Sequence, residues 1–288
     1  MSIPNENKLL SPFRDVMATI RRRRSCRAFA SSPLDATQRA HVQRLLQALP
    51  PPPFGSPVAL HLVDRAGIGV PKLGTYGVIK GAQHYLAGAA SSQDLEAYGY
   101  VLEWMILAAT ELGLGTCWLG GTLTRDSFAE AVGATSSQDI PAVTPIGVPS
   151  ERRTLVDSTF RYLAGSDQRK PWERLFFRNA FDTPLTRQDA GSWAEVLEAV
   201  RLAPSASNKQ PWRIVRSEDG AWQLFLRRTA GYGRMMSVDL QRLDLGIALC
   251  HFDLAAKAKR LAGRWQVLGA GPSVGSLPED TSYVATWA

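Results

Sequence analysis

Apolar residues recur at helical spacing in two long segments of the chain, and each segment predicts a long buried helix. The first reads "YGYVLEWMILAATELGLGTCWLGG" over residues 98–121, and the second reads "LGIALCHFDLAAKAKRLAGRWQVLG" over residues 245–269. Their apolar positions follow the three-to-four-residue spacing of a helix. The two segments also align without gaps, with Gly99 on Gly246 and one tryptophan on another. Helical spacing explains the apolar matches but not the matched glycine and tryptophan, so the alignment indicates an internal repeat.

The repeat extends to the N-terminal side of both segments. The string "CRAF" at residues 26–29 aligns with "RNAF" at residues 178–181, and a Pro-Leu pair follows each. An amphipathic helix pattern comes next in both halves, followed by a loop and an apolar strand pattern. Each half therefore reads helix, helix, loop, strand, long helix, strand. This order predicts an α+β fold with helices packed on sheets rich in antiparallel strands.

The repeat also predicts where the chain divides. We expect an N-terminal tail over residues 1–14, a first half over 15–165 and a second half over 166–288, with the junction near Gly165. A chain of 288 residues is long enough for one large domain or two modest ones, which agrees with two related halves.

The composition is that of an ordinary soluble protein and narrows the classes of function. Hydrophobic residues make up 45% of the chain, which is enough for a core, and 20% of residues are charged. No apolar run reaches the length of a membrane span, and the N-terminus lacks the apolar centre of a signal peptide. The three cysteines have no metal-type spacing and cannot all pair, which favours a reducing compartment. We therefore expect a cytoplasmic protein with no metal and no membrane partner.

The net charge of +7 raises the question of an anionic partner, and the densest basic run is "RRRRSCR" at residues 21–27. A nucleic-acid surface usually spreads basic residues over a wide face with exposed aromatic residues between them, and this run does not. The run lies between apolar residues, so some of its arginines must point toward the protein. Two interpretations stay open: a solvated helix end, or a pocket for a small phosphate ligand. We expect no nucleic-acid partner.

Three motifs give the chain a specific resemblance. They are "RRSCRAF" at residues 23–29, "LAATELGLGTCWLGG" at 107–121 and "APSASNKQPW" at 203–212. With these motifs, the chain resembles the FMN-dependent nitroreductase family, and in particular a branch in which one duplicated polypeptide mimics the usual homodimer. The resemblance covers nearly the whole chain beyond about the first 15 residues. It implies a nitroreductase-like fold, an FMN site between the two halves, and a monomer that acts as a pseudo-dimer.

The resemblance implies that both halves supply residues to one FMN site. From the first half, Arg23, Ser25 and Arg27 would hold the phosphate and the pyrimidine edge, because the planar fork of arginine donates two parallel hydrogen bonds. The other implied contacts are Pro204, Ser205, Ala206 and Asn208 along the ring edge and ribityl chain, Gly120 and Gly121 near flavin N5, Arg169 at the phosphate, and Lys80 beside the flavin. These residue types also have ordinary structural interpretations, since serine and asparagine satisfy turns and glycine ends helices.

Only one of the two equivalent sites keeps its polar residues. At the second position the aligned residues are Leu175, Phe177 and Asn179 from the second half, which would meet Pro51 and Phe54 from the first. An arginine has become leucine, and a hydroxyl and an amide have each become phenylalanine. We expect apolar side chains to fill the second pocket and the chain to bind one FMN.

If FMN binds, the resemblance implies an NAD(P)H oxidoreductase. NADH or NADPH would deliver a hydride to flavin N5 and leave, and a small quinone, nitro or similar acceptor would then take the electrons in a ping-pong scheme. The protein would orient the ring and stabilise charge without a catalytic side-chain set, since the four histidines share no motif. Two alternatives remain: a flavin-binding storage or sensor protein without turnover, and, less favoured, a basic protein that binds nucleic acid or another anion.

Overall fold

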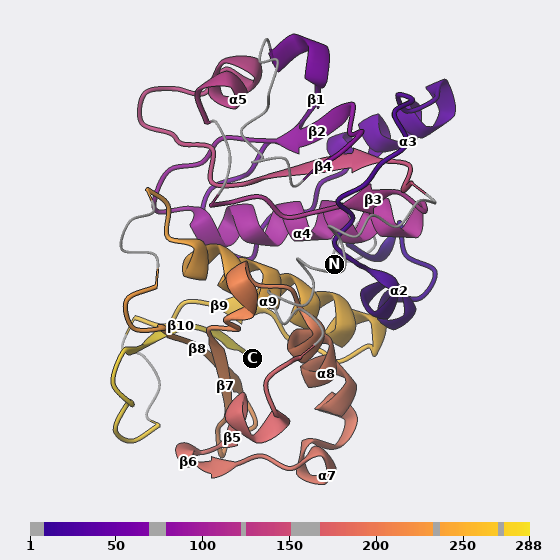
Figure 1. Cartoon of the computed structure of the whole chain (residues 1–288). Helices are drawn as coiled ribbons and strands as arrows, with labels where there is room; N and C mark the ends of the chain where they lie inside the picture. The colour runs from indigo at the N-terminus through magenta and orange to yellow at the C-terminus, as the bar shows by residue number, and fades with distance from the viewer. Residues whose placement is uncertain (1–8, 69–78, 122–124, 151–167, 233–236, 270–273) are drawn as a thin grey trace, which may run out of the picture.

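Two long helices form the middle layer of the protein. The computed structural model describes residues 9–68, 79–121, 125–150, 168–232, 237–269 and 274–288. Helix α4 (Leu95–Glu111) packs along helix α9 (Leu240–Ala258), with one sheet above the pair and another below (Figure 1). Both helices are buried on nearly every side. A helix that is apolar all round belongs in the interior of a protein, which explains the two apolar segments of the sequence.

The two glycines that align in sequence lie where the long helices cross. A Cβ atom added to Gly99 would lie 2.2 Å from the carbonyl oxygen of Leu243, and one added to Gly246 would lie 2.1 Å from the carbonyl oxygen of Glu96. Only glycine permits so close an approach of two backbones. The matched glycines therefore mark equivalent points on the two halves, at their contact.

The sheets on either side of the helices repeat one strand order. The first sheet has the order β1-β2-β4-β3, with all pairs antiparallel, and consists of β1 (His61–Asp64), β2 (His84–Ala87), β3 (Gly115–Thr116) and β4 (Val143–Gly147). The second has the order β6-β5-β7-β8-β10-β9 and consists of β5 (Phe176–Arg178), β6 (Ala180–Pro184), β7 (Trp212–Arg216), β8 (Trp222–Arg227), β9 (Trp265–Gln266) and β10 (Thr281–Trp287). Apart from β5 and β6, each strand of the second sheet has a counterpart in the first. In order along the sheets, β7 corresponds to β1, β8 to β2, β10 to β4 and β9 to β3. The predicted α+β fold built from two tandem repeats is confirmed.

The segments that align upstream of the two repeats pack at different places. In the first half, the backbone N–H of Cys26 donates to Thr116 at 2.8 Å, and that of Phe29 donates to Lys80 at 2.9 Å. In the second half, the aligned segment forms β5, which pairs in parallel with β7. The sequence "LFF" can be buried on both faces of a sheet, whereas the charged "RRS" of the first half cannot.

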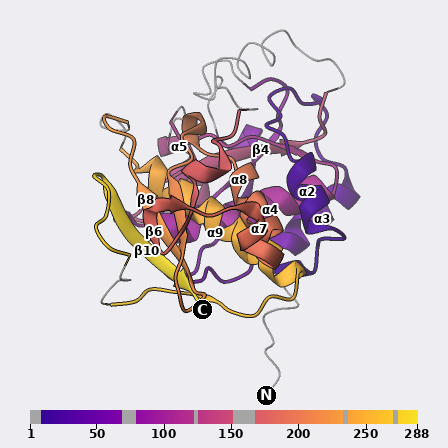
Figure 2. The same ribbon diagram turned by 90° about the horizontal axis from the view of Figure 1, so that it is seen from below.

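Shorter helices surround the two long helices and the sheets. They are α2 (Val16–Arg22), α3 (Ala36–Gln47), α5 (Arg125–Val132), α7 (Arg187–Ala190) and α8 (Ala194–Leu202). Helices α2 and α8 pack on the long helices, and α3 and α5 pack against β1. Figure 2 shows α2 and α3 on the opposite side of the molecule from β10. The described part of the predicted N-terminal tail is packed, because the indole of Trp104 donates to the carbonyl of Leu9 at 2.9 Å. The predicted junction near Gly165 lies outside the described residues, so the division into halves at that point stays a prediction.

Among the helices that the structure describes, none is long and apolar enough to cross a membrane.

Candidate functional site

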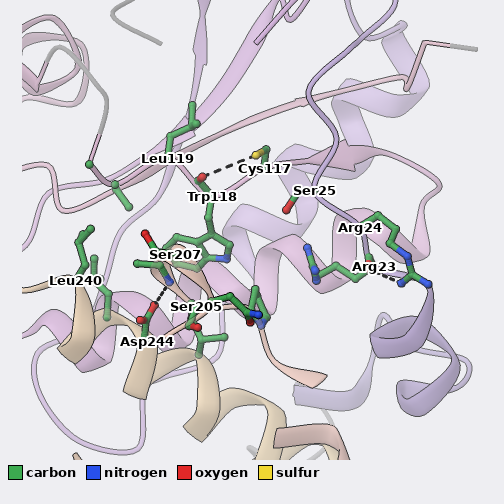
Figure 3. Close-up of a pocket in the computed structure, with 18 of the residues that line it drawn as sticks. Arg23, Arg24, Ser25, Cys117, Trp118, Leu119, Ser205, Ser207, Leu240 and Asp244 are labelled. Atoms are coloured by element: carbon green, nitrogen blue, oxygen red, sulfur yellow. Dashed lines mark hydrogen bonds between the residues drawn. The ribbon is translucent and has the colours of Figure 1, made fainter. Parts of the chain in front are cut away.

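A cavity of about 640 Å³ lies between the two halves. Its walls come from the end of α2 and the segment that follows it, the loop after β3, the loop after α8, and the first turns of α9. Figure 3 shows Arg23 and Ser25 on one side of this space, Ser205, Ser207 and Asp244 on the other, and Trp118 between them. The volume falls within the usual range for pockets that take small molecules and cofactors.

The structure brings the candidate residues from the sequence together, with one exception. The cavity is lined by Arg23, Ser25, Arg27, Gly120, Gly121, Arg169, Pro204, Ser205, Ala206 and Asn208. Lys80 does not line it and is exposed. Only the backbone of Lys80 is near the site, because its N–H donates to the carbonyl of Arg27 at 2.8 Å.

The basic run splits between the cavity and the surface. Arg21, Arg23, Arg24 and Arg27 line the cavity, whereas Arg22 is turned away into an ion pair with Glu111 at 2.8 Å. The side chain of Arg23 makes no hydrogen bond with any described residue, although the residue is only 8% exposed. Burial lowers the pKa of Arg23, and the nearby Glu103 carboxylate opposes this shift. Arg23 is enclosed by the protein and its side chain reaches the cavity, which a solvated helix end does not explain, so the structure favours the pocket interpretation of this run.

The loop after α8 is held in an unusual backbone conformation. Ser207, Asn208 and Gln210 all have positive φ angles, of 47°, 54° and 46°. Such angles are uncommon outside glycine and gather at binding sites, where surrounding bonds enforce them. Here the backbone N–H of Gln210 donates to Ser205 Oγ at 2.8 Å, and Arg169 donates to Asn208 Oδ1 at 2.7 Å. Ser205 and Asn208 therefore do satisfy the turn, and through that turn they also fix Arg169 at the cavity wall.

Asp244, which the sequence analysis missed, is a buried carboxyl in the cavity wall. It is only 2% exposed, its Oδ1 accepts the backbone N–H of Ala206 at 2.9 Å, and its Oδ2 is buried without a partner among the described residues. Burial raises the pKa of Asp244 well above its usual range. The available signal was an aspartate inside an apolar helix pattern, "RLDLGIALC".

Trp118 connects the cavity to a buried polar group between α4 and α9. Its indole N–H donates to Glu103 Oε2 at 2.7 Å, and the other oxygen of Glu103 lies 2.8 Å from His251 Nε2. His251 Nδ1 lies 2.8 Å from the carbonyl oxygen of Ala199, which can only accept, so Nδ1 donates there. Glu103 and His251 are both fully buried and come from different halves. This chain of hydrogen bonds fixes the indole at the cavity wall.

The position expected for a second site is partly filled by the core. Leu175 is fully buried, and Phe54 is half-buried against the same cluster of core residues. Phe177, however, lies on the outer face of the second sheet beside Val215 and does not share that cluster. The expectation that Phe177 meets Phe54 is therefore wrong, because β5 lies between β6 and β7 and its successive side chains point to opposite faces of the sheet.

This architecture and its lined cavity place the chain among the nitroreductase-like proteins. Residues 15–256 match the model of the family described as "Putative TM nitroreductase", and the chain belongs to that family. A solved structure described as a "putative nitroreductase" from Thermotoga maritima is similar in fold, with a TM-score of 0.59, 19% identity, and coverage of 95% of this chain and 93% of that chain.

Other solved structures match about half of this chain. A nitroreductase with bound FMN from Bacteroides fragilis has 16% identity and a TM-score of 0.37, and covers 50% of this chain and 92% of its own. An FMN-dependent nitroreductase from Clostridium difficile has 18% identity and a TM-score of 0.37, and covers 47% of this chain and 88% of its own. No curated protein matches the chain in sequence.

Proposed function

We propose that this protein is an FMN-dependent oxidoreductase that takes electrons from NADH or NADPH and passes them to a small quinone, nitro or similar acceptor. The observation that supports this most is Arg23, which is only 8% exposed and lines a cavity between the two halves without a side-chain hydrogen-bond partner among the described residues. A buried charge is costly unless it is paired and hydrogen-bonded. A bound phosphate would supply that partner.

The residues of the cavity fit the shape and charge of FMN. Arg23, Arg27 and Arg169 would hold the phosphate and the polar edge of the ring, because guanidinium groups donate in pairs to such oxygens. Gly120 and Gly121 present backbone at the cavity wall. A Cβ atom at Gly120 would lie 2.8 Å from Leu240 Cδ2, so the missing side chain there makes room for Leu240 and not for the ring. On the opposite side, Asp244 would present a protonated carboxyl, which donates a hydrogen bond without adding negative charge.

Flavin supplies the hydride chemistry when it is bound, and the protein supplies binding and orientation. Trp118, fixed through Glu103, would hold the ring in one plane. Arg27 would stabilise negative charge at the pyrimidine edge. The three cysteines Cys26, Cys117 and Cys250 form no disulfide with one another, which supports the further proposal of a cytoplasmic location.

The first test is the visible spectrum of the purified protein, followed by titration with FMN. Arg23→Gln should weaken FMN binding by about 1.5–3 kcal/mol, the scale of a hydrogen bond to a charged group. Arg22→Gln is the matched control, because it removes the same charge from a side chain that points away from the cavity. Equal losses in both variants would contradict a shaped site. A yellow protein that turns over neither NADH nor NADPH would favour flavin storage or sensing instead.

Stoichiometry is a separate test of the pseudo-dimer. We propose that one FMN binds per chain and that the chain acts as a monomer, since Leu175 and Phe54 are packed into the core where a second site would lie. Flavin released by heat from saturated protein measures the ratio. A ratio near two would overturn the single-site proposal.

A further inference from the structure

Two cationic side chains meet at one carbonyl oxygen outside the cavity. Lys170 Nζ donates to the backbone oxygen of Gln210 at 3.3 Å, and Arg213 Nη1 donates to the same oxygen at 3.0 Å. Arg213 lies in β7, where its neighbours Trp212 and Ile214 belong to the main core. Because successive strand residues point to opposite faces, Arg213 lies on the outer face of the second sheet.

These cations have no carboxylate partner in the part of the chain that the structure describes. Arg213 is only 6% exposed, and its Nε is buried without a hydrogen bond. None of the described ion pairs includes Lys170, Arg213 or Arg227. Lys170 is half-buried and Arg227 is exposed, so Arg213 is the buried member of the group. Charged groups are almost never buried unless they are paired, so the burial of Arg213 requires an explanation.

The positive charges of Lys170, Arg213 and Arg227 repel one another. Burial and then the charges of Arg213, Arg227, Lys209 and Arg174 lower the pKa of Lys170 to about 8. Burial and then Arg227 lower the pKa of Arg213 to about 10. A bound anion would remove the repulsion between the cations.

We propose that Lys170, Arg213 and Arg227 form a second anion site, which takes a phosphate group. An arginine fork and a lysine point charge side by side suit the oxygens of a tetrahedral oxyanion. None of the three residues lines the cavity, so this site is distinct from the proposed FMN site and does not depend on it. The phosphate can come from free inorganic phosphate or from a nucleotide that carries an extra phosphate monoester, as NADPH does and NADH does not.

Gln210 connects this site to the cavity wall. Its Oε1 accepts the backbone N–H of Lys170 at 2.8 Å, and its Nε2 donates to Asn208 Oδ1 at 3.1 Å. Asn208 in turn holds Arg169, which lines the cavity. Phosphate at the second site would therefore brace the loop that carries the cavity residues.

The test is a calorimetric titration of the full-length protein with inorganic phosphate. The protein is first saturated with FMN, so that the FMN phosphate excludes inorganic phosphate from the cavity. Sodium chloride at equal ionic strength separates binding from screening of charge. We expect saturable binding that weakens about tenfold or more in Arg213→Gln and in Lys170→Gln, the scale of a lost charge-assisted hydrogen bond. Arg178→Gln is the control, because it removes an exposed arginine of the same sheet.

Further measurements keep the proposal testable if a variant fails to fold or if FMN does not bind. In the unaltered protein, phosphate should raise the pKa of Lys170 from about 8, which the pH dependence of amine acetylation measures. Without FMN, the titration is repeated in Arg23→Gln to remove binding at the cavity. A tenfold preference for NADPH over NADH that is lost in Arg213→Gln identifies a nucleotide source, and equal NADH and NADPH affinities identify free phosphate. The proposal is overturned if phosphate does not bind, or if Arg178→Gln weakens it as much as Arg213→Gln.

Discussion

The crossing of α4 and α9 makes Gly246 a sensitive position in the protein. In Gly246→Ala, the new methyl group would lie 2.1 Å from the carbonyl oxygen of Glu96 and 2.7 Å from the backbone nitrogen of Tyr100. Both atoms belong to the backbone of α4, so no side-chain rotation can make room. The two helices would have to separate by more than an ångström to reach ordinary contact distance.

Two opposing effects set the size of the change. Alanine is favoured over glycine in a helix by about 1 kcal/mol. Overpacking a close contact costs about 1–3 kcal/mol, occasionally more, and here it acts on two buried backbones. We expect the overpacking to win, with a net loss of about 2 kcal/mol in the free energy of unfolding. The cavity should also suffer, because Leu243 and Asp244 on the same helix line it.

Urea denaturation followed by circular dichroism measures this change, and FMN titration measures its effect on the cavity. Gly269→Ala is the matched control, because no atom lies within 4 Å of a Cβ at that position. We expect the control to change stability by less than about 0.5 kcal/mol. If Gly246→Ala is neutral or stabilising, the helices do not touch at this glycine and the reasoning is refuted.

Three further predictions concern charged groups. The raised pKa of Asp244 means that its proton stabilises the folded protein at low pH and that this contribution is lost as pH rises through the folded pKa. From about pH 4 upward the unaltered protein should lose stability relative to Asp244→Asn, by at most about 1.4 kcal/mol per pH unit. Urea denaturation at several pH values measures this difference in stability. A difference that does not change with pH would contradict a protonated carboxyl. Glu103→Ala should lower the free energy of unfolding by about 3–5 kcal/mol, because it leaves His251 and the indole of Trp118 without their buried partner. A loss below about 1 kcal/mol would show that the pair is not isolated from water. Lys80→Gln should leave FMN affinity unchanged, since the side chain does not line the cavity, and a clear loss in titration would return it to the site.

The repeat and most of the cavity residues were predictable because they rest on local pattern. The alignment of Gly99 with Gly246 indicates from sequence alone that the two long helices are equivalent, and the structure shows that both glycines lie where these helices cross. The arginine run and the polar loop were recognised as motifs, although sequence alone did not separate Arg22 from its neighbours. That separation depends on Glu111, a partner that is distant in the sequence.

Other features depend on tertiary packing and have no local signal. Asp244 and the loop after α8 meet at the cavity wall, where the backbone N–H of Ala206 donates to Asp244. The positions of Lys170 and Arg213 follow from which face of the second sheet is buried, which a single strand pattern does not reveal. The alignment places Phe177 opposite Ser25, but Ser25 lies beside β3 whereas Phe177 lies in β5 beside β7, and the sequence has no local signal for this difference.

The buried pair of Glu103 and His251 shows what an internal repeat within one polypeptide permits. The alignment of the long helices places Cys250 opposite Glu103 and Trp104 opposite His251, so the pair occurs once. In an assembly of two copies of one gene product, every substitution appears twice and must be tolerated in both places. In one polypeptide that carries both repeats, a mutation alters one repeat alone. Selection can then change one repeat at the interface without the same change in the other.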